Sequence, residues 1–173
     1  MRLLLIALLL ISSLNAESGI LKIEWPELNP KHQKPSIPYP NILTKGVKDT
    51  ELPVYIPNSY AYDKKMVVVA DKNFYTISFF IDNAIVMIAG DRTFQETISK
   101  SDSKLQKVIK PSPVEFIEEE GVMSSDFNRH GVNYTLSIEC DDYKSDNRCK
   151  EEDFLRNLYN RLIIVGGKKW DIF

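Results

Sequence analysis

The chain has 173 residues, of which 43% are apolar and 27% charged, and its formal net charge is -2. This mild acidity lacks the basic excess that binding to a phosphate backbone requires, so the composition argues against a nucleic-acid partner. The length and the ordinary apolar content predict one folded domain and exclude a wholly disordered chain.

Residues 1–16 are typical of a secretory signal peptide. Arg2 precedes an unbroken apolar run over residues 3–11, and the small residue Ala16 follows a short polar stretch. The run is far shorter than the ~20 residues that cross a bilayer, so cleavage after Ala16 is favoured over a membrane anchor. The expected mature protein, residues 17–173, is periplasmic or secreted and not membrane-spanning.

Residues 17–50 are expected to form a proline-rich extended arm. Five of the nine prolines fall within residues 26–40, a spacing that prevents a helix and disfavours a central strand. The arm either docks on a partner or is a flexible lead into the folded domain. Trp25 and Tyr39 give it apolar surface.

The folded domain is expected to begin with a short edge strand over LPVYIP, which is bounded by prolines. Three β-branched and aromatic runs follow, and they lie at residues 66–70, 74–81 and 84–90. Asp82 and Asn83 separate the last two runs and tolerate the positive φ of a tight hairpin. The three runs therefore predict an antiparallel meander.

After Gly90 the apolar spacing becomes helical. Apolar residues recur near the helical period at Phe94, Ile98, Leu105 and Val108. Thr93 is placed to cap a helix and Pro111 to end it, and a polar cluster over residues 99–103 interrupts the pattern. We expect one short helix, followed by a loop or a second helical turn.

The second half carries further strands and the clearest helix. The runs PVEFIEEEG, VMSSDF and VNYTLSIEC are typical of strands, and Gly131 suits a hairpin turn between the last two. KEEDFLRNLYNRL places Phe154, Leu155, Leu158 and Leu162 on one helix face, with acids in the first turn. The strand LIIVGG follows.

Cys140 and Cys149 are the only cysteines. An even count in an exported chain, with mostly polar residues between the pair, predicts one local disulfide. Its loop closure should stabilise the fold by roughly 2–3 kcal/mol. A metal or redox pair is disfavoured because the spacing is not CxxC and His130 is the only histidine nearby.

The segments NFYTIS and NYTLSI resemble each other. Aligning Tyr75 with Tyr134 and Gly90 with Gly167 gives two related strand pairs, one plain and one elaborated by the disulfide loop and a helix. The two tyrosines would then hold equivalent places, where they either line a shared groove or pack in the core.

These elements together predict an α+β domain over residues 51–173, with a mostly antiparallel sheet and one or two helices packed on one face. Its possible duplicated units are the halves 51–110 and 111–173.

The sequence indicates binding more than catalysis. A serine or cysteine nucleophile needs a base, and the two histidines, His32 and His130, fall in the proline arm and in a turn. No metal ligand set and no cofactor motif is predicted. The candidate binding residues are Tyr75 and Tyr134 together with the charged residues after the glycine-ended strands, Asp91, Arg92 and Lys168.

The leading hypothesis is an exported, non-enzymatic protein that binds another envelope macromolecule, a protein or a polymer, through its sheet edge, proline arm or disulfide loop. A periplasmic carrier or sensor of a small ligand is the alternative, and it would need a cavity enclosed by apolar strands. A hydrolase that uses two carboxylates facing each other across a cleft is a third hypothesis. The oligomeric state is not predicted.

Overall fold

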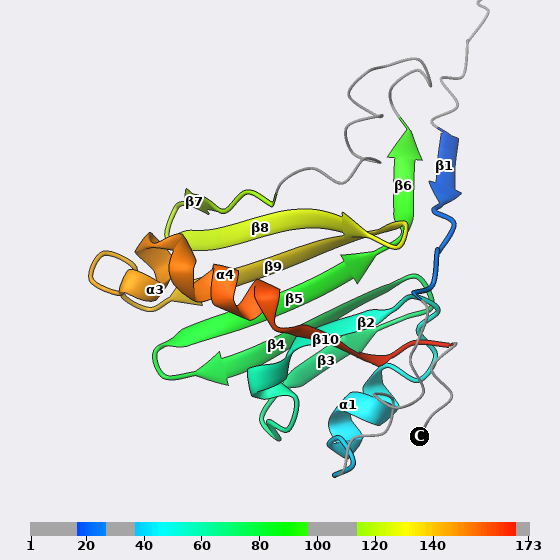
Figure 1. Cartoon of the computed structure of the whole chain (residues 1–173), viewed down its shortest axis with the longest axis horizontal. Coiled ribbons are helices and arrows are strands. Elements are labelled where there is room, and N and C mark those ends of the chain that lie inside the picture. The colour runs from blue at the N-terminus through cyan, green and yellow to red at the C-terminus, as the bar shows by residue number, and fades with distance from the viewer. Residues whose placement is uncertain (1–16, 27–36, 97–113, 169–173) are drawn as a thin grey trace, which may run out of the picture.

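The computed structural model describes residues 17–26, 37–96 and 114–168 (Figure 1). Its central element is a six-stranded antiparallel sheet with the spatial order β3-β4-β5-β9-β8-β7. The strands are β3 (Val67–Ala70), β4 (Phe74–Ile81), β5 (Ala84–Asp91), β7 (Ile117–Glu119), β8 (Val122–Arg129) and β9 (Val132–Cys140). The predicted α+β class with a mostly antiparallel sheet is confirmed.

The hairpin turns form where the sequence predicts them. Asn83, with a φ of 55°, connects β4 to β5, and His130 and Gly131, with φ values of 56° and 73°, connect β8 to β9. Asparagine and glycine adopt this left-handed conformation at little energetic cost. The turn chemistry therefore sets the register of both hairpins.

A second layer covers one face of the sheet. Helix α4 (Glu152–Asn160) lies over β8 and β9, and α1 (Asn41–Gly46) contacts β3. Between them β2 (Val54–Pro57), which leads into a 3-10 turn (Asn58–Tyr60), pairs antiparallel with β10 (Leu162–Gly166). In Figure 1 this two-stranded ribbon and α4 cross the same face of the sheet. The predicted helix between the last two strands is confirmed.

The hydrophobic core lies between the two layers. Alternate residues of the central strands point into it, and register joins them in rows across the sheet, such as Ile77–Ile88–Leu136. The second layer contributes buried side chains from the ribbon, α4 and α1, among them Val54, Ile56, Leu155, Leu158 and Leu43. The core thus depends on residues far apart in the chain.

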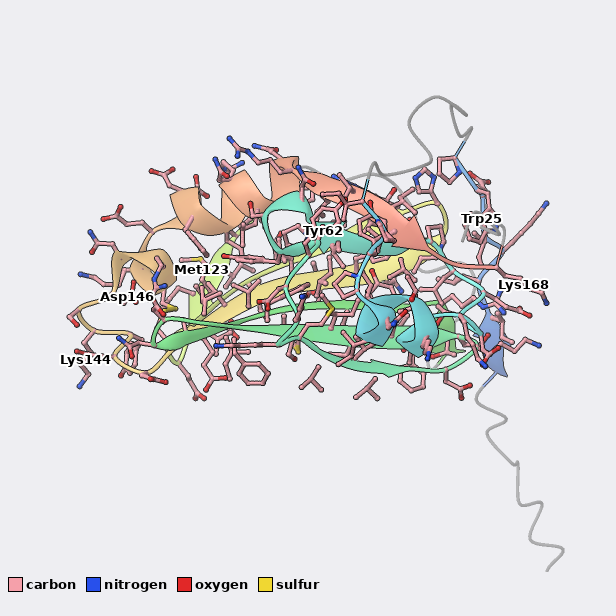
Figure 2. All side chains as sticks on the ribbon, turned by 90° about the horizontal axis from the view of Figure 1, so that it is seen from below. Trp25, Tyr62, Met123, Lys144, Asp146 and Lys168 are labelled. Carbon is pink, nitrogen blue, oxygen red and sulfur yellow. A yellow bond between two sulfur atoms is a disulfide. The ribbon has the colours of Figure 1, made fainter. Side chains whose placement is uncertain are left out.

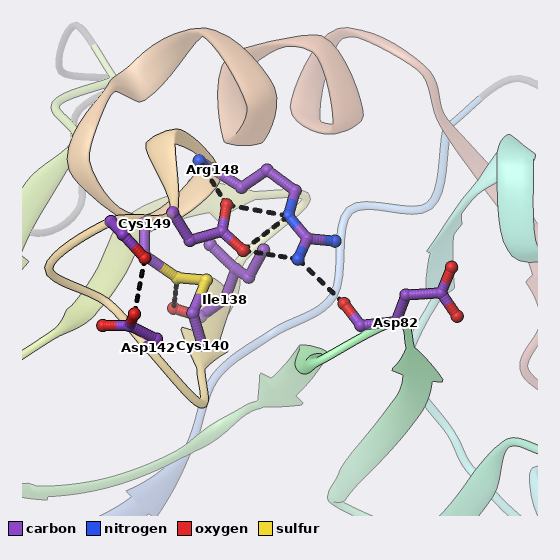
Figure 3. A network of polar contacts seen from close by, with 8 residues as sticks. Asp82, Ile138, Cys140, Asp142, Arg148 and Cys149 are labelled. Carbon is purple, nitrogen blue, oxygen red and sulfur yellow. Dashed lines mark hydrogen bonds and ion pairs between the residues drawn. A yellow bond between two sulfur atoms is a disulfide. The ribbon is translucent and has the colours of Figure 1, made fainter.

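The predicted disulfide is confirmed, and Figure 3 shows the polar contacts around it. Cys140 ends β9 and Cys149 lies in the short helix α3 (Asn147–Lys150). The Asp146 side chain accepts a hydrogen bond from the Arg148 amide and caps α3. The Arg148 guanidinium also donates to the Asp82 carbonyl oxygen at 2.8 Å. The disulfide loop is therefore attached to the β4–β5 turn.

The prediction of a helix beginning at Thr93 is wrong. Residues Thr93–Glu96 form strand β6, which pairs antiparallel with β1 (Glu17–Ile20). The pairing partner lies more than seventy residues earlier in the chain, so a local apolar spacing could not reveal it. The rest of the expected helix, residues 97–111, lies outside the described residues.

Residues 17–50, expected to form an extended arm, contain strand β1 and helix α1. Residues 21–26 are irregular, but α1 forms directly after Pro40, and Leu43 and Val47 are buried in the core. A proline before the first helical turn does not interrupt a helix, which is why the proline run can end where α1 begins. Most of the proline run, residues 27–36, lies outside the described residues.

The aligned halves differ in their strand pairing. The alignment of Gly90 with Gly167 places β10 beside β9, as β5 lies beside β4, whereas β10 pairs with β2. The sheet instead consists of two meanders, β3–β4–β5 and β7–β8–β9, that meet at β5 and β9. By order in these meanders the counterpart of β4 is β8.

Candidate binding site on the open face of the sheet

The two candidate tyrosines lie in the core, where their hydroxyl groups hold β2. The Tyr75 hydroxyl accepts a hydrogen bond from the Tyr55 amide at 2.8 Å and donates to the Tyr55 carbonyl oxygen at 3.1 Å. The Tyr134 hydroxyl donates to the Pro53 carbonyl oxygen at 2.8 Å. Burial raises the pKa of both tyrosines, so both hydroxyls stay protonated. These contacts fix the ribbon on the sheet.

Further rings fill the space around this pair. Tyr55 packs edge-on against Tyr134, and Phe127 stacks on Tyr134 with ring centroids 5.5 Å apart. The Arg129 guanidinium lies 4.5 Å from the Tyr159 ring centroid. Aromatic and cation–π contacts of this kind stabilise the packing of these rings against one another.

His130 adds a polar contact at the rim of these rings. Its Nε2 atom lies 2.9 Å from the Tyr55 hydroxyl, and its carbonyl oxygen accepts a hydrogen bond from the Glu24 amide. Burial lowers the pKa of His130, which favours the neutral imidazole. The residue therefore ties residues 21–26 and β2 to the β8–β9 turn.

The structure brings two of the three charged candidates together at Glu51. Arg92 donates to one carboxylate oxygen at 2.6 Å and Lys168 to the other at 2.8 Å, and Lys72 lies 3.6 Å away. The hydrogen bonds from Lys168 and then Arg92 lower the pKa of Glu51 to about 2. Asp91 does not join this cluster.

The opposite face of the sheet is the candidate binding site, and we call it the open face. It is formed by the alternate residues of the six strands that point away from the core. No described helix or strand packs on it, and in Figure 2 α4 and β2 lie on one side of the sheet while side chains project from the other. Among the residues that the structure describes, a second layer therefore covers only one side of the sheet.

One half of the open face is apolar. Large hydrophobic side chains on β3, β4 and β5 are exposed by 37–56%, and they are Val67, Val69, Phe74, Phe80 and Ile85. In register, Phe74 and Phe80 lie at the two ends of β4, and smaller side chains such as Thr76 and Ser78 lie between them. Exposed apolar side chains gathered on neighbouring strands mark an interaction surface more often than a scattered few do.

The other half is acidic. Its open-face residues include three carboxylates, Glu119, Asp126 and Glu139, beside one exposed apolar side chain, Ile117 on β7. The fourth open-face carboxylate, Asp91, ends β5 beside Phe74, and the open-face residues of the six strands include no lysine or arginine. Glu119 and Glu139 flank Val122 in one row across the sheet, where with Ser124 they line a shallow depression. Asp126 accepts a hydrogen bond from Thr135 at 2.6 Å, and Asp91 accepts two from Thr93.

Sequence reasoning found Asp91 but missed the rest of this face. A signal was present, because β3 reads VVVA and β4 ends in FFI, so apolar residues stand at adjacent positions and must point to opposite faces. Which of the two faces is covered depends on where β2, β10 and α4 return to the sheet. The sequences of the sheet strands alone do not predict where these elements pack.

Comparisons with protein families, with curated proteins and with solved structures found no match for this chain. Within the described ranges, no group of three or more histidine, cysteine, aspartate or glutamate side chains is arranged to hold a metal ion. Among the same residues, no helix is long and apolar enough to cross a membrane. The disulfide fits a protein that resides outside the cytoplasm.

Proposed function

We propose that this is an exported, periplasmic or secreted, non-enzymatic protein that binds another macromolecule of the cell envelope on its open face. The observation that carries the proposal is the set of five large apolar side chains exposed on three adjacent strands. The domain already buries an ordinary core on the other face of the same sheet, so these side chains do not contribute to that core.

The dimensions of the open face support a macromolecular ligand. Strands lie ~4.8 Å apart and rise ~3.3 Å per residue, so four strands of eight or nine residues with two short edge strands span on the order of 600 Å². A standard protein interface buries about 800 Å² on each partner. A surface that is flat and this wide suits a protein or a polymer better than a small molecule, which prefers a concave site.

The proposal is tested by site-specific photocrosslinking in cells that export the protein. A photoreactive phenylalanine analogue replaces Phe80 on the open face, Tyr143 in the disulfide loop or Ile37 in the proline-rich segment, all of which are exposed. The three positions sample the three surfaces that the sequence offered for binding. We expect one defined crosslinked species from Phe80 and none from the other two.

A double variant tests whether the crosslink at Phe80 requires the exposed apolar side chains around it. The double substitution Val69→Ser and Ile85→Ser should abolish capture by the analogue at Phe80, since it removes exposed apolar surface without touching the core. Crosslinks that arise from Tyr143 or Ile37 and not from Phe80 would locate binding elsewhere and refute the proposal.

A further inference from the structure

Resting on the proposed function, we propose that the partner of the open face is a protein whose surface combines apolar side chains with lysine or arginine. The open face itself has this complementary character. Five of its exposed large apolar side chains lie on β3–β5, with Asp91 as the one carboxylate there, and three carboxylates lie on β7–β9, with Ile117 as the one large exposed apolar side chain there.

The row at one end of the sheet shows the arrangement most directly. Phe80, Ile85, Glu139, Val122 and Glu119 lie side by side on five successive strands. At ~4.8 Å between strands, the row changes from aromatic to acidic within ~20 Å. A partner that fills it needs apolar groups at one end and cations roughly 10–20 Å away.

The same charges argue against three other occupants. Anionic lipid headgroups and nucleic acids would be repelled by four carboxylates with no cation among the open-face residues. A second copy is disfavoured as well, because the chain has a net charge of -2 and two such faces bring like charges together. A cationic, apolar protein surface avoids each of these costs.

Binding is tested with defined probes and the disulfide-intact exported protein. The probes are a helical peptide of leucine and lysine, the matching peptide of leucine and glutamate, a lysine and serine peptide of equal charge, and vesicles that contain phosphatidylglycerol. Titration calorimetry at low and at high salt measures each affinity. We expect binding of the leucine–lysine peptide only, and weaker binding at high salt because screening reduces exposed charge pairs.

Charge variants assign the binding to the open face. Glu119→Gln with Glu139→Gln should weaken binding of the leucine–lysine peptide about three- to tenfold, since each exposed ion pair contributes modestly. Glu151→Gln with Asp153→Asn changes the net charge equally near the start of α4 and should leave the affinity unchanged.

The outcomes separate this inference from the proposed function. Equal affinity of the two charge variants, preference for the leucine–glutamate peptide or the vesicles, or a concentration-dependent dimer through the open face would each overturn the cationic partner. The crosslink at Phe80 would survive in the first two cases, and binding on the open face would stand. Loss of that specific crosslink would instead remove both proposals.

Discussion

Replacement of Tyr75 by phenylalanine tests whether β2 is held by side-chain hydroxyl groups in place of a neighbouring strand. β2 has one strand partner, β10, and on its other side the Tyr55 amide and carbonyl both bond to the Tyr75 hydroxyl. Tyr55 is 5% exposed and Tyr75 is fully buried, so water cannot replace the lost hydroxyl. Phenylalanine keeps the ring packing and removes only the polar contacts.

The magnitude follows from the two backbone groups left without a partner. A buried donor or acceptor that loses its hydrogen bond costs roughly 1–3 kcal/mol, and the phenyl ring avoids the desolvation of the hydroxyl. We therefore expect Tyr75→Phe to lower the free energy of unfolding by about 2–4 kcal/mol. Tyr134→Phe leaves one carbonyl group, that of Pro53, without its hydrogen bond. It should lower the free energy of unfolding by about half as much.

Urea unfolding followed by tyrosine fluorescence or circular dichroism measures these differences. At roughly 2–4 °C per kcal/mol for a domain of this size, Tyr75→Phe should also lower the melting temperature by about 5–15 °C. Tyr62→Phe is the matched control, because its hydroxyl donates to a carbonyl at an exposed site. If Tyr75→Phe were no more destabilising than Tyr62→Phe, the hydroxyl would not hold β2.

Three further predictions address the disulfide, the charged cluster and the central glycine. Replacing Cys140 and Cys149 by alanine should lower the free energy of unfolding by roughly 2–3 kcal/mol, and reductant should reproduce the loss in the natural protein while leaving the variant unchanged. The depressed pKa of Glu51, about 2 against an ordinary 4.5, stabilises the fold above pH 4.5, and this contribution is lost as the pH falls from 4.5 towards 2. Unfolding curves of Glu51→Gln should therefore show a weaker pH dependence in that window than those of the natural protein, and identical slopes would contradict the role of the cluster. Gly90→Ala should destabilise by about 1–3 kcal/mol in thermal unfolding, because the added methyl group would lie 2.6 Å and 2.8 Å from two tyrosine rings; an unchanged melting temperature would show that these rings can move.

The sequence alone predicts the features that depend on residues close to one another in the chain. The strands around Asn83 and Gly131 follow from alternating side chains and from turn residues that accept a positive φ. The disulfide follows from two cysteines nine positions apart in a chain whose sequence predicts export. Helix α4 follows from apolar residues on one face and acids in its first turn.

Features that depend on residues far apart in the chain could not be predicted from the sequence. β6 forms because β1, more than seventy residues earlier in the chain, supplies its hydrogen bonds. Helix α1 is short, and the burial of Leu43 against the sheet, more than its local propensity, stabilises it. The open face is defined by the position of the second layer, which covers only one side of the sheet among the described residues.

The likeness of NFYTIS to NYTLSI has a local cause in the structure. β4 and β9 lie on either side of β5, and Tyr75 and Tyr134 both face Gly90 in one row. The absent side chain of Gly90 leaves room for both rings, whose hydroxyls then reach consecutive parts of the chain around β2. Two strands in matching positions beside one glycine need similar residues whether or not the units were duplicated.

The carboxylates of the open face oppose self-association of its exposed apolar residues. A sheet with large hydrophobic side chains on its surface is prone to associate with itself, particularly where edge strands are long. Here the edge strands β3 and β7 have four and three residues, Glu139 lies on β9 beside Ile85, and Asp91 lies on β5 beside Phe74. Like charges oppose the pairing of two such faces, whereas a partner with cations is attracted to the same side chains. Under the proposed function, one arrangement of charges would both oppose the association of two copies of this protein and favour a cationic partner.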